Sequence, residues 1–400
     1  MQKNWRTPVV VLLAGALIVN FSMGIRHGMG LFQLPITGDL GFTRESFGFA
    51  IAVQNICWGV STPLLGMVAD KHGAGRVIFF TCLLYALGLW GMELATTPLM
   101  LALTGGALIG IAQGGCTVGV VTGVIGRAVA PEQRQRALAI SGALGAAGQF
   151  YLTPLLQWII SSYGWRAALI VAALLMVIIV PMALALTEPG RTTGAVADQQ
   201  SVGAAIREAW GERSFRLLFL GFFVCGLQLA FITVHLPAYL RDQGMNANAA
   251  VMALALIALS NIAGTYLWGM QGVKRPKRYL LSAIYFLRAV VILGFVLMPI
   301  STTSVYIFAL CMGSLWLSTV PLTNGLVAQI FGVKYLSMLA GIVFFGHQVG
   351  SFLGAWVGGY LFDTTGSYNL AWLLAAGFGL FAALVHLPIV ETPLARRAAA

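Results

Sequence analysis

Charged side chains are scarce in this sequence. Asp, Glu, Lys and Arg together make up 9% of its 400 residues, whereas a soluble domain carries about 25%. Hydrophobic residues account for 59%, and the mean hydropathy is +0.87. The composition therefore excludes an ordinary soluble fold and predicts an integral membrane protein built from helices.

Enzyme and cofactor motifs are also lacking. The chain has no GxxxxGK[ST] loop for nucleotide phosphates, so we expect neither ATP nor another cofactor. Its five cysteines lie apart within apolar runs, at positions 57, 82, 116, 225 and 311. This spacing is typical of packing residues and unlike a disulfide set or a metal site. We predict that the protein is not an enzyme and holds no metal.

Long apolar runs fill most of the chain instead. Twelve of them reach the length of about 20 residues that a membrane-spanning helix needs. They form two groups of six, near 8–32, 45–68, 77–95, 98–125, 137–161 and 166–186, and near 215–240, 247–270, 279–299, 303–331, 336–361 and 369–388. We therefore predict an all-α membrane protein with an N-terminal six-helix bundle (1–186), a cytoplasmic linker (187–214) and a C-terminal six-helix bundle (215–400).

Lys and Arg determine the expected orientation, because loops rich in these residues stay on the cytoplasmic side. With the N-terminus inside, 18 of the 23 basic residues lie in cytoplasmic connections, three lie on the outer side, and only Arg26 and Arg288 lie within spans. This split predicts that both termini are cytoplasmic, in a multi-pass protein of a bacterial inner (plasma) membrane. It also accounts for the net charge of +11 without a nucleic-acid partner.

The two groups of helices carry an internal repeat. A shift of 202 or 203 residues pairs Gly41 with Gly244, Gly66 with Gly269, Pro35 with Pro237, Gly148 with Gly350, and Gly164 with Gly366. Landmarks at so constant a spacing indicate two equivalent halves related by a pseudo-two-fold axis. Transporters built in this way bind substrate between the halves near the midplane of the membrane, and the halves rock around it.

The most specific motif is GMVADKHGAGRV, residues 66–77. Gly66, Asp70, Lys71, Gly73 and Arg76 match the G-x-x-x-D-[RK]-x-G-x-[RK]-[RK] loop, and the chain therefore resembles the major facilitator superfamily of transporters. The resemblance covers the whole chain. It implies the major facilitator fold, with twelve transmembrane helices in two pseudo-symmetric bundles, in a protein that we expect to be monomeric.

The resemblance also implies a conformational latch at this loop. We expect Gly66 to let two helices approach closely, and Asp70 to cap the positive N-terminus of a helix in the opposite half, near 335–337. Arg76 or Arg127 would neutralise Asp70 from its own half. The equivalent loop of the second half has Val273 in place of the acid, so we expect a lopsided latch.

Three further stretches, 134–148, 163–169 and 341–368, resemble the monocarboxylate and oxalate/formate transporter branch of the superfamily. The acidic-Gly-Gly-aromatic signature of animal monocarboxylate carriers is absent. The helix 8 Arg and the helix 11 Lys of oxalate carriers are absent as well. The branch favours a small organic anion, in particular a monocarboxylate, and leaves the substrate open.

Arg26 is the candidate anchor for such an anion. No Asp or Glu lies deep in any predicted span, so we expect no acidic partner for this cation. A charge at the centre of the bilayer costs about 2.5–3.5 kcal/mol, and a guanidinium binds a carboxylate through two parallel hydrogen bonds. The alternative is that Arg26 reaches the outer surface or bonds to backbone carbonyls.

Histidine is the expected proton carrier, because its pKa lies near working pH and no deep carboxylate is present. His27, His235 and His347 fall in helices 1, 7 and 11. The alternative for each is a core histidine bonded to a carbonyl. From cavity helices 4 and 10 we expect three further substrate-binding residues, Gln113, Trp316 and Asn324.

Together these features predict a secondary transporter that moves a small organic anion with a proton across a lipid bilayer by alternating access. Two other activities stay open, the proton-driven export of small hydrophobic or cationic compounds and the import of a siderophore or small metabolite. Drug antiporters of the superfamily carry a Gly-Pro-rich helix 5 motif and a membrane acid, and neither is found in this sequence. A membrane receptor with the same fold is the alternative from another class.

Overall fold

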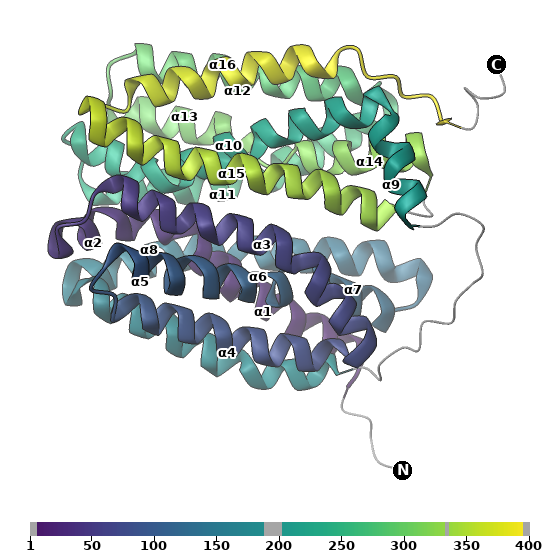
Figure 1. Ribbon diagram of the computed structural model, residues 1–400, viewed down its shortest axis with the longest axis horizontal. Coiled ribbons are helices and arrows are strands. Elements are labelled where there is room, and N and C mark those ends of the chain that lie inside the picture. Colours follow the sequence, from purple (N-terminus) through teal and green to yellow (C-terminus); the bar gives the residue numbers. More distant parts are fainter. Residues whose placement is uncertain (1–5, 188–201, 333–335, 395–400) are drawn as a thin grey trace.

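The computed structural model describes residues 6–187, 202–332 and 336–394, and this part of the chain contains helices and no strand. Eleven of the described helices are long and apolar enough to cross a membrane. Figure 1 shows them in two packed groups, α1–α8 and α10–α16, with helix axes along the long dimension of the molecule.

The first group contains spans with interruptions. Its first span consists of α1 (Pro8–His27), a 3-10 turn (Met29–Phe32) and α2 (Gln33–Leu40). The next two are α3 (Arg44–His72) and α4 (Ala74–Glu93). The fourth consists of α5 (Pro98–Leu101), a π-helical stretch (Ala102–Leu108), α6 (Ile109–Cys116) and α7 (Val118–Ala128). The group ends with α8 (Pro131–Ile179) and a 3-10 helix (Val180–Leu186).

The second group follows α9 (Val202–Gly211), a short helix inside the predicted linker. Its spans are α10 (Arg213–Asp242), α11 (Ala247–Lys274), α12 (Lys277–Leu297), the pair α13 (Thr302–Ser314) and α14 (Thr319–Phe331), α15 (Leu336–Thr365), and α16 (Asn369–His386).

The long element α8 comprises two spans joined at Gly164, whose φ of 86° and ψ of 166° are not helical. Just after this glycine, the Trp165 indole donates a hydrogen bond to Asp39 at the end of α2 (3.1 Å). At the other end of the molecule, Arg6 donates to the Ala185 carbonyl (3.3 Å). Residues 165–185 therefore cross the molecule by themselves, and the eleven helices provide the twelve spans that the sequence predicts.

Equivalent glycines have equivalent roles in the two groups, which confirms the pseudo-symmetry. A Cβ atom at Gly148 would collide with the backbone of Asn20, and one at Gly350 with the backbone of Phe223. Asn20 and Phe223 are themselves 203 residues apart. Left-handed backbone also recurs at paired positions, in Gly41 with Gly244 and in Gly164 with Gly366.

The two groups are joined by polar contacts where α3 begins, which we term the Arg44 end. The Arg44 guanidinium binds the Asp242 carboxylate, with Nη2 2.8 Å from Oδ1. Asp363, in the last turn of α15, accepts hydrogen bonds from the backbone N–H of Arg44 (3.3 Å) and of Glu45 (2.6 Å). A carboxylate at this position caps the positive N-terminus of α3. We refer to Arg44, Glu45, Asp242 and Asp363 as the Arg44 clamp.

A pair of equivalent residues lies two helical turns from the clamp. The Gln33 amide donates to Nδ1 of His235 (3.1 Å), and both side chains are fully buried. These residues are 202 positions apart, so their contact lies on the pseudo-two-fold axis. From this end, α3 and α15 stay in contact as far as the rings of Trp58 and Phe344, whose centroids are 5.3 Å apart.

Replacing Arg44 with Ala is expected to open the Arg44 end, because the ion pair between the two groups is lost. A charge-assisted hydrogen bond contributes about 1.5–3 kcal/mol, so the ratio of closed to open molecules should fall about tenfold or more. Spin labels on cysteines introduced at the exposed residues Gly38 and Asn248, with the native cysteines replaced, would report a longer distance. The swapped pair Arg44→Asp with Asp242→Arg should restore the short distance. An unchanged distance in Arg44→Ala would contradict this account of the clamp.

Candidate functional site

The Arg26 guanidinium, near the end of α1, is held by side-chain amides. Its Nη2 donates to Asn55 Oδ1 (2.7 Å), and its Nη1 donates to Gln54 Oε1 (3.2 Å) and Gln113 Oε1 (3.4 Å). The Trp58 ring lies 4.5 Å from the guanidinium carbon, within range of a cation–π contact. Every one of these partners is neutral, and Arg26 is only half-buried. Its positive charge therefore has no acidic partner in the described part of the chain.

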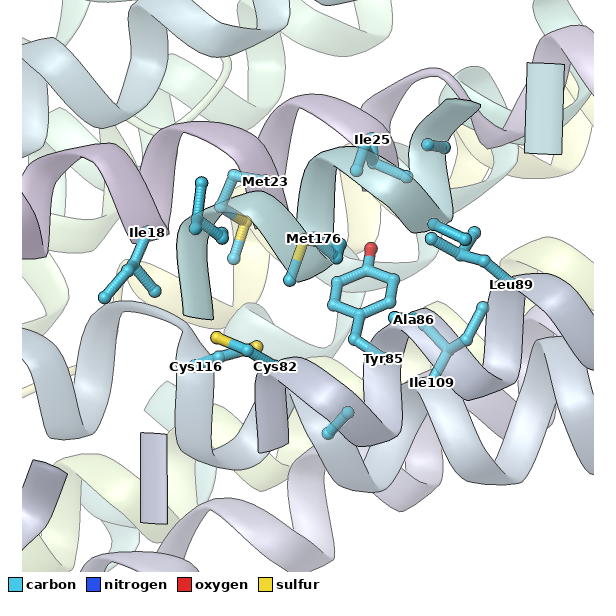
Figure 2. Packing of buried hydrophobic residues seen from close by; sticks show 14 of the residues in the cluster. Ile18, Met23, Ile25, Cys82, Tyr85, Ala86, Leu89, Ile109, Cys116 and Met176 are labelled. Carbon is cyan, nitrogen blue, oxygen red and sulfur yellow. The ribbon is translucent and has the colours of Figure 1, made fainter. Parts of the chain in front are cut away.

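A second shell of contacts orients two of these amides. The Gln54 amide N–H donates to the Gly105 carbonyl (2.8 Å) in the π-helical stretch. The Gln113 amide N–H donates to the Tyr85 hydroxyl (3.3 Å), which donates in turn to the Ser22 carbonyl (3.1 Å). Figure 2 shows this hydroxyl among apolar side chains of several helices. Because both N–H groups are engaged elsewhere, the amide oxygens face Arg26.

The repeat allows a direct comparison with the second group. The equivalents of Arg26, Tyr85 and Gln113 are Gln228, Arg288 and Trp316. Arg288 is fully buried and donates to the Leu315 carbonyl (2.6 Å), the Trp316 carbonyl and Gln228 Oε1 (3.4 Å). Both carbonyls lie in the break between α13 and α14, so Arg288 stabilises the C-terminal end of α13. The second arginine is thus enclosed by backbone, whereas Arg26 is not.

Two of the candidate histidines are bonded to backbone carbonyls. His235 is fully buried and donates from Nε2 to the Ala355 carbonyl (2.7 Å), while its Nδ1 accepts two hydrogen bonds, one of them from the Tyr368 hydroxyl (3.3 Å). His27 is half-buried and donates from Nδ1 to the Met23 carbonyl one turn earlier (2.8 Å). His235 therefore has both ring nitrogens engaged.

His347 is linked to Arg26 across the two groups. Its Nδ1 lies 3.0 Å from Gln348 Oε1, and the Gln348 amide N–H donates to the backbone carbonyl of Asn55 (3.2 Å). The side chain of Asn55 is the one that accepts from Arg26. The ring also stacks on Phe344, with centroids 5.8 Å apart. A continuous chain of contacts therefore runs from α1 through α3 to α15.

The structure brings together only part of the predicted substrate-binding set. Arg26, Gln113 and His347 belong to one connected group. Trp316 is buried in the break between α13 and α14 with 2% of its surface exposed, and Asn324 is exposed on α14. Sequence reasoning did not select Gln54, Asn55, Gln348 or Tyr85. The available signal was the pair of amides at 54–55 inside an apolar span, because such amides bond to neighbouring helices.

The predicted latch residues lie at the end of α3 remote from Arg44. No atom lies within 4 Å of the position that a Cβ of Gly66 would take, so this glycine makes no close helix contact in this conformation. Arg76 and Arg127 are exposed. Asp70 falls in the last turn of α3. Its side chain and residue 335 lie outside the described part of the chain.

Comparison with known proteins identifies the family. Residues 12–332 match the model of the Major Facilitator Superfamily. The chain belongs to this superfamily. One relative is monocarboxylate transporter 13 of Rattus norvegicus, 28% identical over 404 residues, or 96% of this chain and 89% of the relative. Another is the uncharacterized transporter YcxA of Bacillus subtilis (strain 168), of the same superfamily, 24% identical over 395 residues, or 94% of each chain.

Solved structures support the same fold. An inward-facing, unoccupied bacterial homolog of the human lysosomal transporter Spinster superposes with a TM-score of 0.76 at 15% identity, covering 97% of this chain and 98% of that one. A mutant of the nucleoside transporter NupG superposes with a TM-score of 0.73 at 18% identity, covering 95% and 99%. Because the chain belongs to the Major Facilitator Superfamily, it is a multi-pass membrane transporter of small molecules and not an enzyme.

Replacing Tyr85 with Phe is expected to destabilise the site, because the Gln113 amide N–H loses its acceptor in an apolar environment. A buried polar group without a partner costs about 1–3 kcal/mol. The melting temperature of the purified protein in detergent should fall accordingly. Tyr163→Phe is the matched control, because that residue is 68% exposed. Equal melting temperatures for the two variants would contradict the role given to the Tyr85 hydroxyl.

Proposed function

We propose that this transporter carries a small organic anion, preferentially a monocarboxylate, and that Arg26 binds the carboxylate. The observation that carries the proposal is a half-buried guanidinium whose partners among the described residues are all neutral, namely three amide oxygens and the Trp58 ring. A carboxylate is a stronger acceptor than an amide and can take two parallel N–H bonds from one guanidinium. An arriving anion therefore replaces weak partners with a strong one and compensates the buried charge.

The contrast with Arg288 supports the choice of Arg26. Arg288 is fully buried, and two backbone carbonyls and an amide oxygen occupy its donors. A ligand would have to break those hydrogen bonds, which would destabilise the non-helical segment between α13 and α14. Arg26 donates to side-chain oxygens alone, so a carboxylate can replace these weaker acceptors without breaking a bond to helix backbone. Relatives named monocarboxylate transporter 13 (28% identical) and monocarboxylate transporter 11 (24% identical) agree with an anionic substrate.

We assign the accompanying proton to His347. His235 has both nitrogens bonded inside the contact between the two groups. His27 is adjacent to Arg26, and a second positive charge there is repelled. His347 is connected to Arg26 through Asn55 and Gln348. Uptake of one anion with one proton would be electroneutral, so neither charge crosses the membrane alone.

Alternating access then follows from contacts at the two ends of α3 and α15. In this conformation Asp363 of α15 caps the N-terminus of α3 and closes the Arg44 end. We propose that Asp70, in the last turn of α3, caps the N-terminus of α15 in the same way when the opposite end closes. We propose that this end faces the cytoplasm, because it carries the excess of Lys and Arg, and that the protein acts as a monomer in a bacterial inner membrane.

Arg26→Ala is expected to lose most saturable counterflow of labelled lactate in proteoliposomes, because the carboxylate loses its two donors. A hydrogen bond to a charged group contributes about 1.5–3 kcal/mol, which corresponds to at least about a tenfold weaker apparent affinity. Arg166→Ala is the matched control, because Arg166 is half exposed and pairs with acids near the Arg44 end. Full lactate counterflow in Arg26→Ala would exclude Arg26 from substrate binding.

His347→Gln is expected to keep the exchange of lactate across the membrane but to lose its accumulation against a gradient. Counterflow at equal pH needs no net proton movement, so it should persist. Accumulation driven by a pH gradient should disappear, because the ring that takes up the proton is gone. His72→Gln, at an exposed position, should behave like the wild type in both assays. Retention of gradient-driven accumulation in His347→Gln would show that another group carries the proton.

A further inference from the structure

We infer that Gln348 is a positioning residue that selects the tautomer of His347 and ties the proton site to the contact between the two halves. The inference rests on the proposed function where it concerns transport. Gln348 is fully buried on α15, where that helix meets α3. Its amide engages two groups at once, with Oε1 3.0 Å from His347 Nδ1 and Nε2 3.2 Å from the Asn55 carbonyl oxygen.

One arrangement of hydrogens satisfies both contacts. The Asn55 carbonyl can only accept, so the amide must turn its NH2 group toward it. The amide oxygen then faces His347, and Nδ1 must carry a hydrogen in order to donate. Nε2 is therefore the nitrogen that gains a proton. The other tautomer would set the lone pair of Nδ1 against the amide oxygen, or would turn that oxygen toward the Asn55 carbonyl.

The remaining neighbours of His347 contribute less to this selection than Gln348 does. On its own helix, Ser351 donates its hydroxyl to a backbone carbonyl of α10, so its oxygen can only accept from Nδ1, at 3.4 Å and hence more weakly than Gln348 at 3.0 Å. From α10 the titratable neighbour is Cys225, whose thiol forms a hydrogen bond with the His347 side chain. The nearest described cation on that side is Arg288 of α12, 3.5 Å from the Cys225 sulfur and already bound to carbonyls.

The two hydrogen bonds of the Gln348 amide, to His347 and to Asn55, couple protonation of His347 to the movement of the halves. Gln348 and Asn55 belong to opposite halves, so their hydrogen bond breaks when α3 and α15 separate. A protonated His347 is a stronger donor to Oε1, and it polarises the amide so that the NH2 group binds Asn55 more tightly. A proton on His347 therefore favours the conformation closed at the Arg44 end. Anion binding reaches the same hydrogen bonds, because Arg26 donates to the Asn55 side chain.

The direct test is the tautomer of His347 in the purified full-length protein, measured by NMR on 15N-labelled histidine and assigned by difference from His347→Asn. Nδ1–H should dominate in the wild type. Gln348→Met, which keeps the length of the side chain without its amide, should lower the ratio of Nδ1–H to Nε2–H about fivefold, as expected for one lost hydrogen bond. Ser351→Ala is the comparison and should lower the ratio less than Gln348→Met does, because its contact with Nδ1 is longer.

Two NMR results would overturn the inference, an unchanged ratio in Gln348→Met and a wild-type His347 that carries Nε2–H. The second needs no Gln348 variant, so a Gln348→Met protein that fails to fold does not protect the inference. Transport of labelled lactate distinguishes it from the proposed function. If the wild type moves no lactate but the ratio shifts, the proposed function fails and the positioning role stands. If the wild type accumulates lactate with protons and Gln348→Met does so equally, the positioning role in transport fails.

Discussion

A guanidinium inside an apolar bundle needs partners, and the chemistry of those partners decides what the protein can bind. Around Arg26 they are amide oxygens held in place by Tyr85 and by a π-helical stretch of the fourth span. Amides stabilise the cation enough for the helices to pack around it. They leave its charge uncompensated, so an anion from solution gains more from the site than the resident groups do.

In the two halves, one architecture holds one arginine that we propose binds substrate, Arg26, and one structural arginine, Arg288. The repeat sets Arg26 on the first span of one half and Arg288 on the third span of the other, with Gln228 and Tyr85 at the exchanged positions. In the second half the break between α13 and α14 exposes backbone carbonyls, and Arg288 satisfies them. This asymmetry places the free charge in one half and the candidate proton site, His347, in the other. Arg26 and His347 are connected through the hydrogen bond between Gln348 and Asn55, which joins the two halves.

Much of the fold was predictable from the sequence because it depends on local or periodic features. Apolar length defines the spans, and glycine spacing defines the repeat, since Gly148 and Gly350 each sit where a Cβ would meet backbone. The site was predictable only in part. Trp316 was expected in a continuous tenth helix, but the chain breaks at 315–318 and buries it. The contact between Gln348 and Asn55 joins residues 293 positions apart, and no local pattern reports such a pair.

Binding of a carboxylate by Arg26 is tested most directly by the distance between the two groups. Solid-state NMR on the reconstituted protein, with 13C at the carboxylate of bound lactate and 15N in arginine, measures how close the two groups come. The Arg26→Lys variant identifies which part of the 13C–15N coupling comes from Arg26. The account predicts a separation of about 4 Å, the span of a hydrogen-bonded pair. A saturably bound lactate whose carboxylate shows no coupling to the Arg26 nitrogens would contradict it.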